Sequence, residues 1–180
     1  MLDIEEFKKK LDRKSRLLGI DPGTNSTGYG VISSYQGTER LMAVGEIKTK
    51  GAIENKLAII HQELTQIIAQ HQPNVFAIES VFVNKNVNSA LKLGQARGVA
   101  ICACAQAGLC MHEYAPREIK QATVGYGSAN KEQIQHMVKQ ILGIKTALGL
   151  DASDALAIAL THAQHQRWQA ALNKSTQKLT

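Results

Sequence analysis

The sequence predicts a mixed α/β domain, in which a central sheet is covered by helices on both faces. Three strand-like segments follow one another near the start, where a turn or hairpin signal separates them. Two later short apolar runs alternate with segments of helical periodicity, which is the pattern of parallel strands with helical crossovers. A chain of 180 residues, 44% of them hydrophobic, can bury one such domain but not two large lobes.

The first strands are indicated by apolar runs and turn signals. Residues 17–20 are almost pure hydrocarbon, and a glycine-rich turn at 21–28 follows them. Second and third strands are expected at 29–33 and 41–48, because Gly37 and Thr38 mark a hairpin between them.

Helices alternate with strands in the rest of the chain. Leu57, Ile60, Leu64, Ile67 and Ile68 form an apolar face at helical spacing, so we expect a helix at 55–71, ending before Pro73. After it we expect a strand at 75–78, a helix at 88–107, a strand at 111–114, a loop containing Pro116, a helix at 130–142 and a last helix from Ala152.

The two ends of the chain are read as lying outside the domain at 16–170. Residues 1–15 mix both charges, with Ile4, Phe7 and Leu11 at helical spacing, and form an extension of unknown role. The polar residues 171–180 are expected to be a disordered tail.

The charge balance favours a polyanionic partner. Lys and Arg number 21 against 15 Asp and Glu, which gives a net charge of +6 and suits nucleic acid. No stretch reaches the roughly 20 apolar residues of a membrane span, and no apolar segment at the start suits export. We therefore expect a cytoplasmic protein that does not bind membranes.

Four acids stand at the ends of predicted elements. Asp21 ends the first strand, Glu79 ends the strand at 75–78, and Asp151 and Asp154 lie three residues apart at the start of the last helix. Taken singly, each has a structural explanation: Asp caps helices and starts turns, and Glu79 could close a strand at the surface. Together they are expected at one edge of a single sheet.

Carboxylates gathered in that way would repel one another unless cations neutralised them. Hard oxygen ligands select Mg²⁺ or Mn²⁺. Two such ions about 4 Å apart can prepare a water for attack on a phosphodiester and stabilise the departing oxygen. The acids therefore point to metal-assisted phosphoryl transfer, with rigid strands fixing the ligands.

Four blocks of the chain closely resemble the RuvC family of Holliday junction resolvases. They read LGIDPGTNSTGYGVI, AIESVFVNKNVNSALKLGQARGVAI, GSANKEQIQHMV and DASDALAIALTH, in this order, within about residues 16–165. The resemblance implies a ribonuclease H-like fold with a five-stranded mixed sheet. It also implies two Mg²⁺ ions per site, for which Mn²⁺ can substitute. The implied activity is symmetric nicking of two opposing strands of a four-way DNA junction by a homodimer, in recombination and repair. The family's acidic tetrad falls on Asp21, Glu79, Asp151 and Asp154. Partnership with the RuvA–RuvB branch-migration complex is likewise implied.

Several residues are candidates for DNA binding. Phe82 could be a core anchor, but the matching aromatic residue of the family stacks on bases near the junction centre. Lys131 lies in the first turn of a helix, where a cation opposes the helix dipole, so a nearby phosphate would explain it. Lys120 matches a basic position of the family. Lys85 is a looser candidate, because surface lysines are common solubilising residues.

Gly94 and Gly98 lie four residues apart in the helix at 88–107. Glycine inside a helix costs about 1 kcal/mol relative to alanine, so close approach of another backbone is expected there. The sheet or a partner helix could supply it, and the resemblance implies the partner. His136 and His162 lie on apolar helices and are read as partly buried structural residues.

Three other protein classes compete with this interpretation. Actin-like ATPases share the Asp-x-Gly-Thr stretch but need two lobes and a second phosphate loop. Resolvase-like RNA nucleases of the YqgF type share the first block, but they do not explain the match around Phe82 or the Asp151-Ala-Ser-Asp154 pattern. A non-catalytic junction-binding protein predicts the loss of at least one acid, and all four are present.

Overall fold

The computed structural model describes residues 15–80 and 87–176, and it contains a five-stranded mixed sheet. The strands are β1 (Ser15–Asp21), β2 (Ser26–Tyr35), β3 (Thr38–Lys48), β4 (Val75–Glu79) and β5 (Cys110–Tyr114). Their order across the sheet is β3-β2-β1-β4-β5. The pairs β1–β2 and β2–β3 are antiparallel, whereas β1–β4 and β4–β5 are parallel. The predicted mixed sheet is therefore confirmed.

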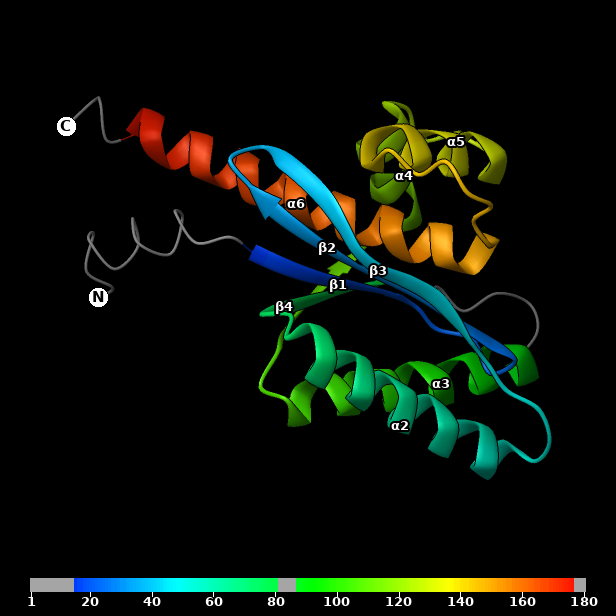
Figure 1. Cartoon of the computed structure of the whole chain (residues 1–180). Helices are drawn as coiled ribbons and strands as arrows, with labels where there is room; N and C mark the ends of the chain where they lie inside the picture. Colours follow the sequence, from blue (N-terminus) through cyan, green and yellow to red (C-terminus); the bar gives the residue numbers. More distant parts are fainter. Residues whose placement is uncertain (1–14, 81–86, 177–180) are drawn as a thin grey trace.

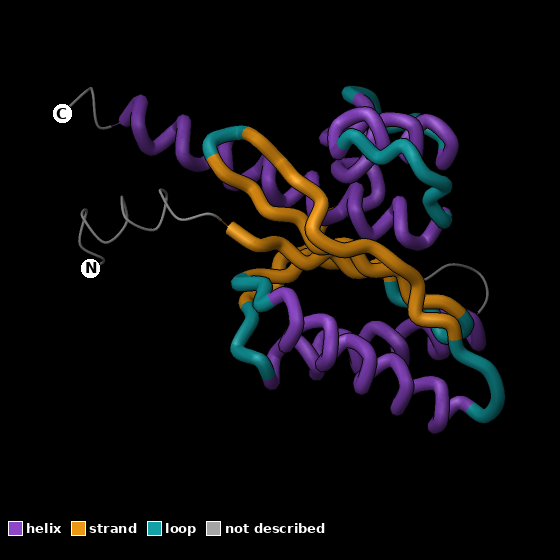
Figure 2. Tube along the Cα trace, viewed as in Figure 1, coloured by secondary structure: helices purple, strands orange, loops and turns teal. Residues whose placement is uncertain are grey.

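Helices cover both faces of the sheet (Figure 1). Helices α2 (Ile53–His71) and α3 (Val87–Gln106) lie on one face, as Figure 2 also shows. On the other face lie α4 (Pro116–Val124), α5 (Lys131–Leu142) and the long α6 (Leu150–Thr176). None of the described helices is long and apolar enough to cross a membrane.

Two hydrophobic cores follow from the alternation of side chains along the central strands. Leu17 on β1 and Ala77 on β4 belong to the core beneath α4, α5 and α6. Leu18 and Ile78 belong to the core against α2 and α3. Because β1 and β4 are buried on both faces, their apolar runs are continuous rather than alternating.

The structure corrects two of the expected element boundaries. Strand β2 begins at Ser26 rather than at residue 29, because Ser26 already pairs with Lys48 of β3. The expected loop containing Pro116 is wrong, since Pro116–Val124 forms the helix α4. Proline is well suited to the first helical position, where its missing N–H loses no bond and its φ angle is already helical. The Glu118 carboxylate accepts a bond from the Ala115 N–H at 2.7 Å and caps this helix.

The ends of the chain relate to the predicted domain in different ways. Residues 171–176 belong to helix α6, although they were expected to be part of a disordered tail. Residues 177–180 lie outside the described part. Residues 1–14 of the predicted N-terminal extension also lie outside it. The domain limits at 16–170 remain a prediction.

Candidate active site

Strands β1 and β4 bring Asp21 and Glu79 to the same edge and the same face of the sheet. Their parallel pairing joins Ile20 to Ile78, so the acids that follow are neighbours on strands about 4.8 Å apart. Side chains alternate between faces, and Asp21 lies two residues beyond Gly19, which packs against α6. Glu79 lies two residues beyond Ala77, which is part of the core beneath the same helix. Both carboxylates therefore face α6.

Helix α6 brings Asp151 and Asp154 to this edge because three glycines let it approach the sheet closely. A Cβ atom added to Gly28 would lie 1.9 Å from the carbonyl oxygen of Asp151. At Gly19 the added atom would lie 2.0 Å from the carbonyl oxygen of Ala155, and at Gly30 it would meet the Leu156 side chain at 2.5 Å. The absence of these side chains sets the height of the helix over β1 and β2.

The electrostatics link all four acids. Burial, together with the charges of Asp154, Glu79 and Asp151, raises the pKa of Asp21 from 3.8 to about 7. Burial and the charge of Asp154 also raise the pKa of Glu79. Repulsion among acids that are distant in the sequence supports the predicted convergence at one site.

Two lysines approach the acids. The Lys131 ammonium at the start of α5 lies 3.0 Å from Oδ2 of Asp154, and this hydrogen bond raises the pKa of Lys131. The charges of Lys131 and Lys120 partly offset the rise in the pKa of Glu79. Two of the three predicted basic residues, Lys120 and Lys131, therefore lie near the acids.

The donor set suits a hard divalent cation, since it consists of carboxylate oxygens held close enough to repel one another. Among the described residues, however, no three His, Cys, Asp or Glu side chains are already arranged to hold a metal ion. Carboxylates repel one another and close on one point only when a cation neutralises them. In this arrangement the ammonium of Lys131 is the cation that contacts Asp154.

The other predicted residues are placed as follows. Gly94 and Gly98 lie on the exposed side of α3, and a Cβ atom added to either would meet nothing within 4 Å. The sheet therefore does not explain these glycines. Phe82 and Lys85 lie outside the described residues.

The two histidines differ. His162 is 3% exposed, its Nδ1 lies 2.7 Å from the Tyr114 hydroxyl, and burial lowers its pKa to about 4. It is a buried structural residue, which agrees with the prediction. His136 is exposed, so the prediction that it is partly buried is wrong.

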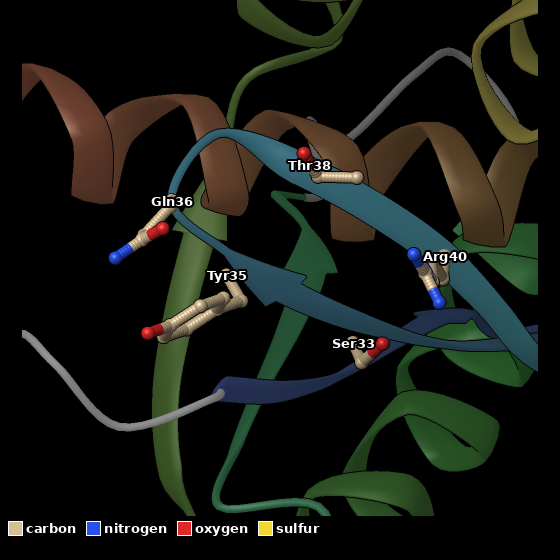
Figure 3. Close-up of a pocket in the computed structure, with 5 residues that line it drawn as sticks. All are labelled: Ser33, Tyr35, Gln36, Thr38 and Arg40. Atoms are coloured by element: carbon tan, nitrogen blue, oxygen red, sulfur yellow. The ribbon is translucent and has the colours of Figure 1, made fainter.

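A surface pocket lies away from the acids. Ser33, Tyr35, Gln36, Thr38 and Arg40 line it at the tip of the β2–β3 hairpin (Figure 3). In the β1–β2 register this tip adjoins Ser15, whereas Asp21 pairs with Gly28 at the opposite end. The pocket is not part of the acidic site.

The fold and the acidic edge define a nuclease of the ribonuclease H-like class. The family model described as crossover junction endodeoxyribonuclease RuvC matches residues 17–162. This chain therefore belongs to the RuvC family, whose members are metal-dependent nucleases.

Individual relatives are similar in sequence to this chain over most of their length. The crossover junction endodeoxyribonuclease RuvC of Tolumonas auensis is 51% identical over 152 residues, which cover 84% of this chain and 88% of that protein. The RuvC of Alkalilimnicola ehrlichii is 46% identical over 161 residues, covering 89% and 98%. The solved structure of T. thermophilus RuvC in complex with a Holliday junction substrate superposes with a TM-score of 0.81 at 33% identity, covering 86% of this chain and 96% of that one. The yeast mitochondrial resolvase Ydc2, with a TM-score of 0.68 at 14% identity, shares the fold.

Proposed function

We propose that this protein resolves Holliday junctions by metal-dependent hydrolysis of one phosphodiester in each of two opposing strands. The observation that carries the proposal is the electrostatic coupling of four acids from β1, β4 and α6 at one sheet edge. The family's activity as a crossover junction endodeoxyribonuclease and the junction bound to the T. thermophilus relative support the substrate. A non-catalytic role is disfavoured, because the raised pKa values of Asp21 and Glu79 would destabilise a fold that had no use for these buried carboxylates.

The metal is Mg²⁺, with two ions per site and Mn²⁺ as a substitute. Asp21, Glu79, Asp151 and Asp154 would hold it, since hard carboxylate oxygens are the ligands that these ions prefer. When bound, such ions activate a water and stabilise the leaving oxygen of a phosphodiester. The protein's own residues orient that chemistry: the strands fix Asp21 and Glu79, while the first two turns of α6 fix the other two acids.

Lysines beside the acids bind the DNA backbone. Lys131 lies in the first turn of α5, where the positive end of the helix and the ammonium together suit a phosphate. Lys120 contributes positive charge on the same side of the site. Phe82 stacks on a base near the junction centre, and Lys85 contacts phosphate; these two roles rest on the family resemblance alone.

The active form is a homodimer that pairs through α3. The exposed side of this helix carries small or apolar residues, including Gly94, Gly98 and Leu91, which is 61% exposed. Glycines in open space lower helix stability, and a partner helix packed on them would compensate. A two-fold dimer also places two sites against two strands. The dimer acts in the cytoplasm with the RuvA–RuvB complex, as the family membership suggests.

The test uses a synthetic immobile four-way junction and a linear duplex of the same arm sequence, each with and without Mg²⁺. We expect paired, symmetric nicks in the junction only, and only with the metal. The Asp21→Asn variant should bind the junction with unchanged or higher affinity but leave it intact. Equal nicking of the linear duplex, or cleavage by the variant at the normal rate, would contradict the proposal.

A further inference from the structure

Arg97 ties the end of strand β4 to the helix on the opposite face of the sheet. It lies in the middle of α3, and only 13% of its side chain is exposed. Its Nη1 donates a hydrogen bond to the backbone carbonyl of Glu79 at 2.7 Å, and its Nη2 contacts Oε1 of Glu113 on β5. The Glu79 carboxylate faces α6, so this residue is held through its backbone from the other side.

The carbonyl of Glu79 needs such a donor because the parallel ladder between β1 and β4 ends there. Ser80 donates its N–H to the Tyr114 carbonyl of β5. Successive residues of a strand direct their N–H and C=O groups to opposite sides, so those of Glu79 point toward β1. With Ile20 paired to Ile78, the next donor along β1 would be the N–H of residue 22. That residue is Pro22, which has no N–H. The guanidinium of Arg97 takes the place of the missing ladder bond.

We propose that Arg97 is a positioning residue, which fixes the end of β4 so that the Glu79 carboxylate can share a cation with Asp21 and Asp154. An arginine suits this role, because its planar fork reaches a carbonyl and a carboxylate at once. The inference rests on the proposed function in one respect: the acids must bind a divalent cation. Loss of a hydrogen-bond partner behind a metal ligand typically weakens metal binding by about 10- to 100-fold.

The experiment measures Mn²⁺ binding to the full chain without DNA, by the electron paramagnetic resonance signal of free Mn²⁺. Arg97→Met should bind Mn²⁺ about tenfold more weakly than the wild type. Arg97→Lys should lose less, because one ammonium can still reach the Glu79 carbonyl. Glu113→Gln, which leaves that bond intact, should stay close to wild type.

Arg167 provides a matched control. Like Arg97, it binds a backbone carbonyl, that of Gly37 at 3.2 Å, and a carboxylate, that of Glu39 at 3.0 Å. It lies on α6 and contacts the β2–β3 hairpin, at the other end of the sheet from the acids. Arg167→Met should therefore leave Mn²⁺ affinity unchanged, although it removes the same kinds of bond.

The outcomes separate this proposal from the one on which it rests. Wild-type affinity in folded Arg97→Met refutes the positioning role; if that variant does not fold, wild-type affinity in Arg97→Gln, whose shorter side chain has no guanidinium to bridge the Glu79 carbonyl and the Glu113 carboxylate, does so. An Mn²⁺ affinity that is the same in the Asp21→Asn variant as in the wild type refutes the metal site itself. Adding Pro22→Ala to Arg97→Met restores an N–H at position 22 and should recover part of the affinity, and no recovery would refute the ladder explanation.

Discussion

Asp21→Asn should make the protein more stable above neutral pH in the absence of divalent metal. The pKa of Asp21 is raised from 3.8 to about 7, so the folded state holds this proton more tightly than the unfolded chain does. Below pH 3.8 both states are protonated and no penalty exists. As the pH rises from 3.8 to about 7, the unfolded chain loses this proton while the folded state keeps it, so stability falls, and above 7 the loss is complete. At about 1.36 kcal/mol for each pH unit between the two values, the penalty reaches about 4 kcal/mol at pH 8.

The amide has nearly the same shape and no charge, so the substitution removes this penalty. The assay is urea denaturation of both proteins at one concentration, in chelator, at several values between pH 4 and pH 8. The stability difference should be near zero at pH 4 and grow toward about 4 kcal/mol at pH 8. Glu63→Gln, on the exposed side of α2, controls for the change in net charge. A difference that does not vary with pH would refute the reasoning.

Four further outcomes are expected. Gly28→Ala should destabilise the fold by about 1–3 kcal/mol in urea denaturation and abolish nicking, because the new Cβ atom lies 1.9 Å from the Asp151 carbonyl oxygen. Gly94→Ala meets nothing within 4 Å in the single chain, so under conditions where the protein is monomeric it should instead stabilise by up to about 1 kcal/mol; equal effects at the two sites would contradict the packing argument. Gly98→Leu should shift the protein toward monomer in analytical ultracentrifugation, and a persistent dimer would place the interface elsewhere. Mg²⁺ at 100 times its Kd should raise stability by about 2.7 kcal/mol, reversibly with chelator, and should not do so in Asp21→Asn.

The sequence predicts the core of this fold well because the central strands are buried on both faces. The apolar runs before Asp21 and Glu79 locate β1 and β4 directly. The helix that begins at Pro116 is missed because proline marks loops as well as helix starts, although Glu118 follows it at the capping position. Spacing signals such as that one are visible in the sequence.

Parts of the site depend on contacts between distant segments and leave no local pattern. The role of Arg97 follows from a strand register and from a proline about 75 residues away, so helix periodicity alone gives no reason to single it out. The pairing of Lys131 with Asp154 likewise joins two helices. The glycines beneath α6 are visible in the sequence, but their purpose is clear only when the helix is seen to rest on them.

The glycines of β1 and β2 beneath α6 offer a way to recognise family members that have lost activity. A homologue can keep all four acids and still fail to gather them if the position equivalent to Gly28 carries a side chain, because the helix would then be lifted off the strands. Searches that score only the acids would accept such a chain as an active enzyme. Surveys of the family separate active from inactive members better when they score these glycines as well as the four acids.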